Sequence, residues 1–183
     1  MTSRLPRRLG GALLAALLAT AGLVALIHLF SSRDSSSLSA VAGPGQLLAD
    51  GGDRHLPRGS SDPLYATDPP ASGAHVVVAV TRDDVALDDD RLLTALEQGN
   101  VVLVYGAISQ RFQLGKIASA ISGPFAASIA AAGQAVILDP LPSVPAGPVL
   151  ALAWRRELRA AGPSDPRLAA FAGYWLGRGA GAG

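Results

Sequence analysis

The chain has 183 residues, of which 49 % are hydrophobic, 15 are basic, 14 are acidic and none is cysteine. The lack of cysteine excludes disulfide bonds, thiolate metal ligands and a cysteine nucleophile. An N-terminal apolar block follows Arg4, Arg7 and Arg8, and the chain after this block carries 12 basic and 14 acidic side chains. This balance argues against a nucleic-acid partner, because a nucleic-acid-binding surface needs a basic stripe.

The apolar block, Leu9 to Phe30, contains 22 residues without a formal charge, and a bilayer core needs about 20 apolar residues in a helix. The arginines before it keep residues 1–8 in the cytoplasm. We therefore expect a single-pass protein of the cell membrane, with the lipid bilayer as partner through residues 9–30 and the C-terminal part extracytoplasmic. A cleaved signal peptide is the alternative, because Ala40-Val41-Ala42 has the small-x-small form of a cleavage site.

Residues 31–45 are rich in serine and glycine and hold few large apolar side chains. This composition is typical of a flexible tether. We expect an extracytoplasmic domain at residues 46–178, a length of about 130 residues that suffices for one core. The glycine and alanine residues at 179–183 predict a disordered tail.

A rigid loop, Tyr65 to His75, is expected to lead into a short strand, His75–Val80, which is rich in valine. Pro69-Pro70 fixes two φ angles, and Gly73 can adopt a positive φ at little cost. Rigid loops on a scaffold often carry binding residues. His75 is therefore the first candidate site residue.

Three aspartates, Asp88–Asp90, precede a group of leucines with helical spacing. Acidic side chains cap a helix start and suit its dipole, and Gly99 is well placed as a C-terminal stop. The pattern predicts a helix over Asp89–Gln98. A calcium loop is the alternative for the aspartates, but no Asp-x-Asp-x-Asp-Gly sequence follows.

The rest of the domain alternates strands and helices. The expected elements are a buried strand at Val101–Tyr105, helical structure over Ser109–Ala132 broken at Gly123-Pro124, a strand at Ala135–Leu138 ended by Asp139-Pro140, a strand at Val149–Trp154, and a helix capped by Ser164 and running through Trp175. The predicted fold is α+β, with a small mixed sheet of about four strands covered by helices and preceded by one transmembrane helix.

Several short motifs occur in a fixed order in the predicted domain. Residues Pro69–His75 read Pro-Pro-Ala-Ser-Gly-Ala-His; His55 and Tyr65 precede them, and Leu96–Tyr105 and Ala153-Trp154-Arg155 follow. In this order they resemble the motifs of domain-of-unknown-function family 3105, whose signature is Pro-Pro-Thr-Ser-Gly-Pro-His. The resemblance covers residues 46–178 and implies a bacterial protein with an N-terminal membrane anchor.

The resemblance also implies that this chain is a divergent member that lacks two family histidines, because Thr94 and Gln98 stand at their positions. His55, His75 and Glu97 remain, and two imidazoles with one carboxylate are a recurring ligand set for zinc or iron. The leading expectation is a degenerate site that keeps its rigid loop as scaffold, and a divalent-metal site is the alternative. Histidine side chains more than about 8 Å apart would exclude that alternative, since zinc–nitrogen bonds are about 2.0–2.1 Å long.

Other arrangements have simpler explanations. Ser72 lies three residues before His75 and close to Asp68, but it lacks the Gly-x-Ser-x-Gly elbow and is expected to be a turn residue. Four aromatic residues are expected to belong to the core: Trp154, Phe171, Tyr174 and Trp175. Three arginines are expected to lie on a solvated surface: Arg155, Arg156 and Arg159.

The leading functional hypothesis is a non-enzymatic envelope binding or accessory module, with Ser72, Gly73, His75, Glu97 and Trp154 as ligand-binding candidates. Its protein or envelope partner is unknown. The alternative is a divalent-metal-binding or metal-dependent enzyme domain that uses His55, His75 and Glu97. A third hypothesis is lateral association through the anchor, where small residues from Gly10 to Ala19 would let helices approach each other.

Overall fold

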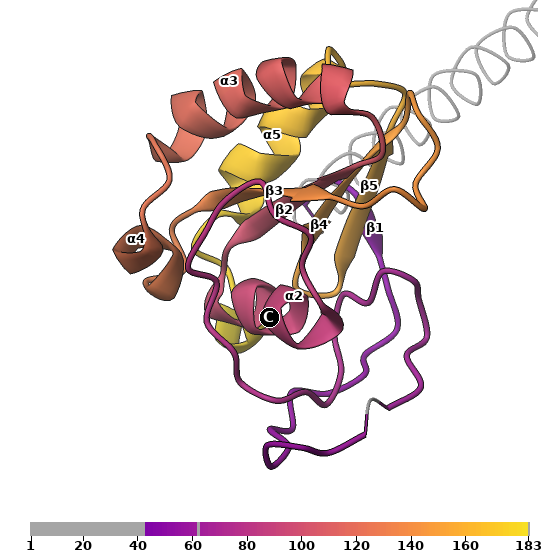
Figure 1. Ribbon diagram of the computed structural model, residues 1–183, viewed down its shortest axis with the longest axis vertical. Helices are drawn as coiled ribbons and strands as arrows, with labels where there is room; N and C mark the ends of the chain where they lie inside the picture. The colour runs from indigo at the N-terminus through magenta and orange to yellow at the C-terminus, as the bar shows by residue number, and fades with distance from the viewer. Residues whose placement is uncertain (1–42, 62, 183) are drawn as a thin grey trace, which may run out of the picture. The chain divides into compact units, whose positions relative to one another are not determined.

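A five-stranded mixed sheet forms the centre of the computed structural model, which describes residues 43–61 and 63–182 (Figure 1). The strands lie in the order β1-β5-β4-β2-β3. β2 and β3 are parallel, and the other neighbouring pairs are antiparallel. The strands are β1 (Gln46–Leu47), β2 (Val101–Tyr105), β3 (Val136–Pro140), β4 (Val149–Ala153) and β5 (Arg156–Ala160).

Helices cover both faces of this sheet. In Figure 1, α3 and α5 lie over one face and α2 lies under the other. The helices are α2 (Asp89–Gln98), α3 (Arg111–Ser122), α4 (Ala127–Ala131) and α5 (Pro166–Trp175), with short 3-10 turns η1 (Ile108–Gln110) and η2 (Ala180–Ala182). The predicted α+β fold with a mixed, helix-covered sheet is therefore confirmed, with five strands instead of about four.

Each face of the sheet has its own hydrophobic core. Alternate residues of a strand point to opposite faces, so Val101, Leu103 and Tyr105 pack in the core under α3 and α5. Val102 and Val104 pack in the core that includes Leu92, Ala95 and Leu96 of α2 and Ala130 of α4. All five residues of β2 are buried, as the uninterrupted apolar sequence predicted.

The helix predicted from the aspartates has the expected bounds. Asp88 is the N-cap residue, and its Oδ1 accepts a hydrogen bond of 2.8 Å from the Arg91 amide. Gly99 ends the helix with a φ of 108° and donates its N–H to Leu96 O at 3.0 Å. The capping explanation for the aspartates therefore holds at Asp88.

The later helices follow the predicted pattern with one shift. The helical stretch is interrupted after Ser122, where Gly123 has a φ of 75°. The last helix begins one residue later than expected, because Asp165 instead of Ser164 caps it by accepting the Arg167 amide at 3.0 Å. Pro166 then occupies the first turn, where a missing N–H costs nothing.

One strand prediction is wrong in the structure, and another strand ends two residues later than predicted. His75–Val80 is not a strand and forms only an isolated bridge at His75, because side chains of α2 satisfy its amides in place of a neighbouring strand. The strand predicted to end before Asp139-Pro140 instead includes both residues, which pair with Val104 and Tyr105 of β2.

Strands β1 and β5 were not predicted. β5 contains the charged residues Arg156, Glu157 and Arg159, which obscure the sequence pattern of a strand. In the structure it lies next to the edge strand β1, and its Leu158 is buried. β4 and β5 form a hairpin through the two residues Trp154 and Arg155. β1 pairs only two residues with β5, too few to give a periodic sequence signal.

The chain segments at either end of the domain carry further predictions. The predicted transmembrane helix at 9–30 and nearly all of the linker at 31–45 lie outside the described residues. Within residues 43–61 and 63–182, no helix is long and apolar enough to cross a membrane. In the segment expected to be a disordered tail, Ala180–Ala182 form η2, which contacts α2.

A buried carboxyl on β3 provides a test of this packing. Burial raises the pKa of Asp139 from 3.8 to about 6, although its Oδ1 accepts the Leu87 amide at 3.0 Å. The folded state thus holds this proton more tightly than the unfolded state, so the contribution of Asp139 to stability falls as the pH rises from about 4 to about 6.

Asp139→Asn keeps an acceptor for Leu87 and removes the buried charge. We expect the variant to be more stable than the wild type by up to about 3 kcal/mol above about pH 7, with the difference shrinking towards about pH 4. Urea unfolding of both full-length proteins across this pH range measures it. A difference that does not change with pH would contradict the assignment.

Candidate metal centre

An isolated parallel β-bridge brings His55 and His75 together. The His75 amide donates to Arg54 O at 3.1 Å, and the Leu56 amide donates to His75 O at 2.8 Å. Bridged residues in a parallel pair project their side chains to the same side. The imidazole ring centroids are consequently 5.4 Å apart, with the ring planes at 72°. This separation is below the roughly 8 Å between histidine side chains that would have excluded a shared metal ion.

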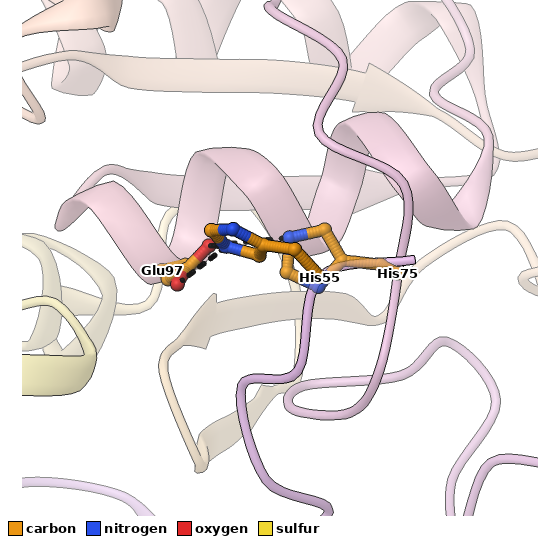
Figure 2. A group of neighbouring side chains, drawn as sticks. All are labelled: His55, His75 and Glu97. Atoms are coloured by element: carbon orange, nitrogen blue, oxygen red, sulfur yellow. Dashed lines mark hydrogen bonds and ion pairs between the residues drawn. The ribbon is translucent and has the colours of Figure 1, made fainter. Parts of the chain in front are cut away.

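Glu97, in the last turn of α2, completes the group. Figure 2 shows its carboxylate directed at both imidazole rings, which come from two adjacent chain segments. His55 Nε2 lies 2.9 and 3.0 Å from the two carboxylate oxygens, and His75 Nε2 lies 3.2 Å from Oε2. One ligand atom from each of the three residues lies within 4.8 Å of the other two. We call these residues the His–Glu cluster.

His75 is held in one tautomer. Its side chain is fully buried, and its Nδ1 lies 2.9 Å from the carbonyl oxygen of Gly73. A carbonyl oxygen can only accept, so Nδ1 carries the proton and, in the neutral ring, Nε2 presents a lone pair. Nε2 is buried and has no hydrogen-bond partner, and Glu97 Oε2, which can only accept, lies 3.2 Å away. An acceptor thus faces an acceptor, and a cation in contact with both atoms would offset their repulsion.

The loop that carries His75 is fixed by a close approach at Gly73. Gly73 has a φ of 148°, and a Cβ at this position would lie 2.8 Å from the ring of Tyr65. The Tyr65 hydroxyl donates to Ala74 O at 3.1 Å. The rigid loop predicted from the proline and glycine residues therefore also depends on tyrosine packing, which holds the Gly73 carbonyl at His75 Nδ1.

A polar face of α2 anchors the segment after His75. Asp90, Thr94 and Glu97 follow the i, i+4, i+7 spacing of one helix face. Asp90 Oδ1 accepts the Val76 amide at 2.8 Å, and Thr94 Oγ1 accepts the Val78 amide at 3.0 Å. Glu97 therefore points to the same segment as Thr94. The spacing of these three polar residues is the sequence signal that could have identified this face.

Ser72 and Trp154, two further predicted site residues, contribute no ligand atom to the cluster. Ser72 Oγ accepts the Gly51 amide at 2.9 Å and donates to Ala49 O at 3.3 Å, so its hydroxyl holds two loops together. Gln98 is exposed. Trp154 lies in the β4–β5 turn and packs against the core on the α2 side. Neither Ser72 nor Trp154 belongs to the group of ligand atoms.

The cluster is open on one side. The His55 side chain is 54 % exposed and that of Glu97 21 % exposed, whereas His75 is buried. Zinc ligands about 2.0–2.1 Å from the ion at tetrahedral angles lie about 3.3 Å from one another. The separations of 2.9 to 3.2 Å between Glu97 and the two Nε2 atoms are close to this value. Three ligands and a solvent-facing position suit an ion with one exchangeable ligand.

Comparison with known proteins identifies a family and no further relatives. The family described as "Protein of unknown function (DUF3105)" matches residues 60–179, which include His75 and Glu97, while His55 precedes the match. No curated protein and no solved structure matches the chain.

Thr94 tests the anchoring of the His75 segment by α2. We expect Thr94→Val, which removes the acceptor for the Val78 amide at nearly constant volume, to cost about 1 kcal/mol of stability. Hydrogen exchange of the Val78 amide should become faster, because that amide has lost its partner. Thr94→Ser keeps the hydroxyl and should retain protection. Equal exchange in the two variants would contradict this anchoring.

Proposed function

We propose that this chain, which belongs to the DUF3105 family of proteins of unknown function, binds a divalent transition-metal ion through His55, His75 and Glu97. The observation that carries the proposal is the buried Nε2 of His75, which has no hydrogen-bond partner and faces a carboxylate. This geometry favours the divalent-metal site over the degenerate site that keeps its loop only as a scaffold. The ligand set, two imidazoles and one carboxylate, supports a zinc-class ion.

The hydrogen bond at the far side of the His75 ring supports the same proposal. Histidine ligands commonly donate their second ring N–H to a backbone carbonyl, which fixes the tautomer and orients the lone pair. The Gly73 carbonyl stands in this position, 2.9 Å from Nδ1. This arrangement would be in place before an ion arrives, so little reorganisation of His75 would accompany binding.

A proton is the simplest competitor of the metal. An imidazolium at His55 or His75 would also compensate the Glu97 charge. However, one N–H of His55 shared by the two carboxylate oxygens, which lie 2.9 and 3.0 Å from Nε2, would still leave the buried His75 Nε2 without a partner. A single ion in contact with all three residues would satisfy the two imidazoles and the carboxylate together. The proposed metal affinity therefore falls as the pH decreases, because protons compete for the same nitrogen atoms.

The ion would occupy a surface-accessible site with three protein ligands. The exposed side of His55 and Glu97 leaves room for water or an incoming group as a further ligand. This supports reversible capture or presentation of the ion, the role of a binding module. A metal polarises a bound water or carbonyl when such a group is supplied.

We further propose that the module is displayed outside the cell membrane. The uncharged segment Leu9–Phe30, with arginines before it, supports an anchor whose N-terminus is cytoplasmic. The Ser/Gly-rich residues 31–45 would then tether the metal-binding unit at the outer face. In this position the His–Glu cluster would meet ions of the envelope.

Zinc titration of the full-length protein in detergent tests the metal site. We expect one ion per chain, and His75→Gln and Glu97→Gln should each weaken binding at least about 10-fold, because each removes one ligand. His28→Gln changes the only histidine outside the cluster and is the matched control. Calorimetry and competition with a chromophoric chelator measure the affinity. Absent binding, or equal binding by His75→Gln and His28→Gln, would refute the proposal.

Topology is tested with reporters fused after Gly183. We expect alkaline phosphatase, which needs an oxidising exterior for its disulfides, to be active, and a fluorescent protein that matures in the cytoplasm to remain dark. The intact mass of the membrane-associated protein distinguishes an anchor from a cleaved signal peptide ending near Ala42. A fluorescent cytoplasmic fusion without phosphatase activity would contradict the proposed orientation.

A further inference from the structure

An arginine-rich cavity of about 190 Å³ lies apart from the His–Glu cluster. The β4–β5 turn, the loop before His55, the end of α5 and the C-terminal segment form its wall. We call it the arginine cavity; its main lining residues are Trp154, Arg155, Arg156, Trp175, Arg178 and Asp50. Both tryptophans of the chain are among them.

Two of the arginines are held by aromatic rings and not by carboxylates. Arg156 Cζ lies 4.7 Å from the ring centroid of Trp175, and Arg178 Cζ lies 4.2 Å from that of Tyr174. Among the described residues, neither arginine forms an ion pair. Stacking occupies the face of a guanidinium group and leaves the N–H donors at its edge available. The rings thus orient two cationic forks without neutralising them.

Arg155 adds a third guanidinium from a strained backbone position. Its φ is 59°, in the left-handed region that costs energy for a residue with a Cβ. The surrounding loops impose this conformation, because the Arg155 amide donates to Ala71 O at 2.8 Å and Leu48 donates to Arg155 O at 2.9 Å. Its Nη1 contacts Asp50 at 3.1 Å, while its Nε is buried and has no acceptor within the described residues.

The cavity therefore holds more donors than acceptors and a net positive charge. Its lining carries three arginines against Asp50 and Asp53. A planar carboxylate is matched by one guanidinium fork, whereas a phosphate presents oxygens in several directions and suits forks from several elements. A volume of about 190 Å³ is well above the roughly 10–15 Å³ that holds one water molecule, so it admits a phosphate group with a short organic part.

We propose that the arginine cavity binds the phosphate group of a phosphate ester. Arg156 supplies donors from β5 and Arg178 from the segment after α5, and Arg155, whose Nη1 pairs with Asp50, adds a third guanidinium at the hairpin turn. The indole rings of Trp154 and Trp175 pack against the organic part of the ester. The phosphate comes either from a soluble ester or from a lipid headgroup, and both sources present the same chemistry to the three arginines.

Intrinsic fluorescence tests this site because both tryptophans line the cavity. Full-length protein in a phosphate-free glycoside detergent is titrated with glycerol 3-phosphate, with EDTA present so that the His–Glu cluster holds no metal. We expect a saturable fluorescence change. Arg156→Gln and Arg178→Gln should each weaken binding at least about 10-fold, since each removes a charged donor. Failure here leaves the zinc titration unaffected, so the two proposals are tested separately.

Arg58→Gln is the matched control, because Arg58 is an exposed arginine outside the cavity. It should bind like the wild type. Thermal unfolding verifies that Arg156→Gln and Arg178→Gln remain folded, and the two variants lie on different elements. No saturable response in the wild type, or equal weakening by Arg58→Gln, would overturn the proposal, the latter showing only a response to net charge.

Vesicles separate the two sources of phosphate. The protein is reconstituted in vesicles of phosphatidylglycerol or of an uncharged glycolipid without phosphate. A cavity already saturated in phosphatidylglycerol, and responsive to glycerol 3-phosphate only in the glycolipid, identifies a lipid headgroup. Equal responses in both vesicles identify a soluble ester. No response in either vesicle overturns phosphate binding.

Discussion

The polar face of α2 is the constraint on which the candidate metal centre depends. Beyond the bridge at His75, the segment Val76–Val78 has no neighbouring strand that would accept its amides, and Asp90 and Thr94 accept two of them. Glu97, one turn further along the same face, meets the His75 side chain. One rigid helix therefore determines both the path of the histidine segment and the position of the carboxylate. Losing this face would remove the carboxylate that lies beside His75 Nε2 and the acceptors that hold the segment after His75.

The C-terminal segment closes against the same end of α2. The Gly177 amide donates to Gly99 O at 2.8 Å. A Cβ at Gly179 would lie 2.0 Å from the carbonyl oxygen of Glu97, so only glycine permits this approach. Because Arg178 and Gly179 also line the arginine cavity, the same short segment borders both proposed sites. This contact fixes the last turn of α2, from which the Glu97 side chain projects.

The two sites have opposite electrostatic character. The His–Glu cluster combines lone pairs and a carboxylate, with the buried His75 Nε2 unsatisfied, and it favours a cation. The arginine cavity presents guanidinium donors, with Arg155 Nε unsatisfied, and it favours an anion. These are the two buried side-chain polar atoms without a partner in the described part of the chain. Since buried polar groups in folded proteins are nearly always paired, each marks a place where a ligand would complete the structure.

Local signals in the sequence were sufficient for the elements whose ends are fixed by nearby residues. Asp88 and Gly99 determined the bounds of α2, the five apolar residues of β2 indicated a doubly buried strand, and Gly123-Pro124 indicated the helix break. The three residues of the His–Glu cluster were already candidates from their chemistry, but their convergence could not be derived from the sequence. His55 and His75 are twenty residues apart, and an isolated bridge of one residue pair leaves no periodic pattern.

Only the tertiary structure decided which groups satisfy the backbone and which remain unsatisfied. The valine-rich segment after His75 has the composition of a strand, yet helix side chains replaced the strand partner, and composition cannot distinguish the two outcomes. β5 was not predicted because three of its five residues are charged, which removes the apolar pattern of a strand. One of these residues, Arg156, lines the arginine cavity. The sequence by itself determined residue chemistry and local conformation; long-range hydrogen bonding and packing, which depend on residues far apart in the chain, determined where that chemistry converges.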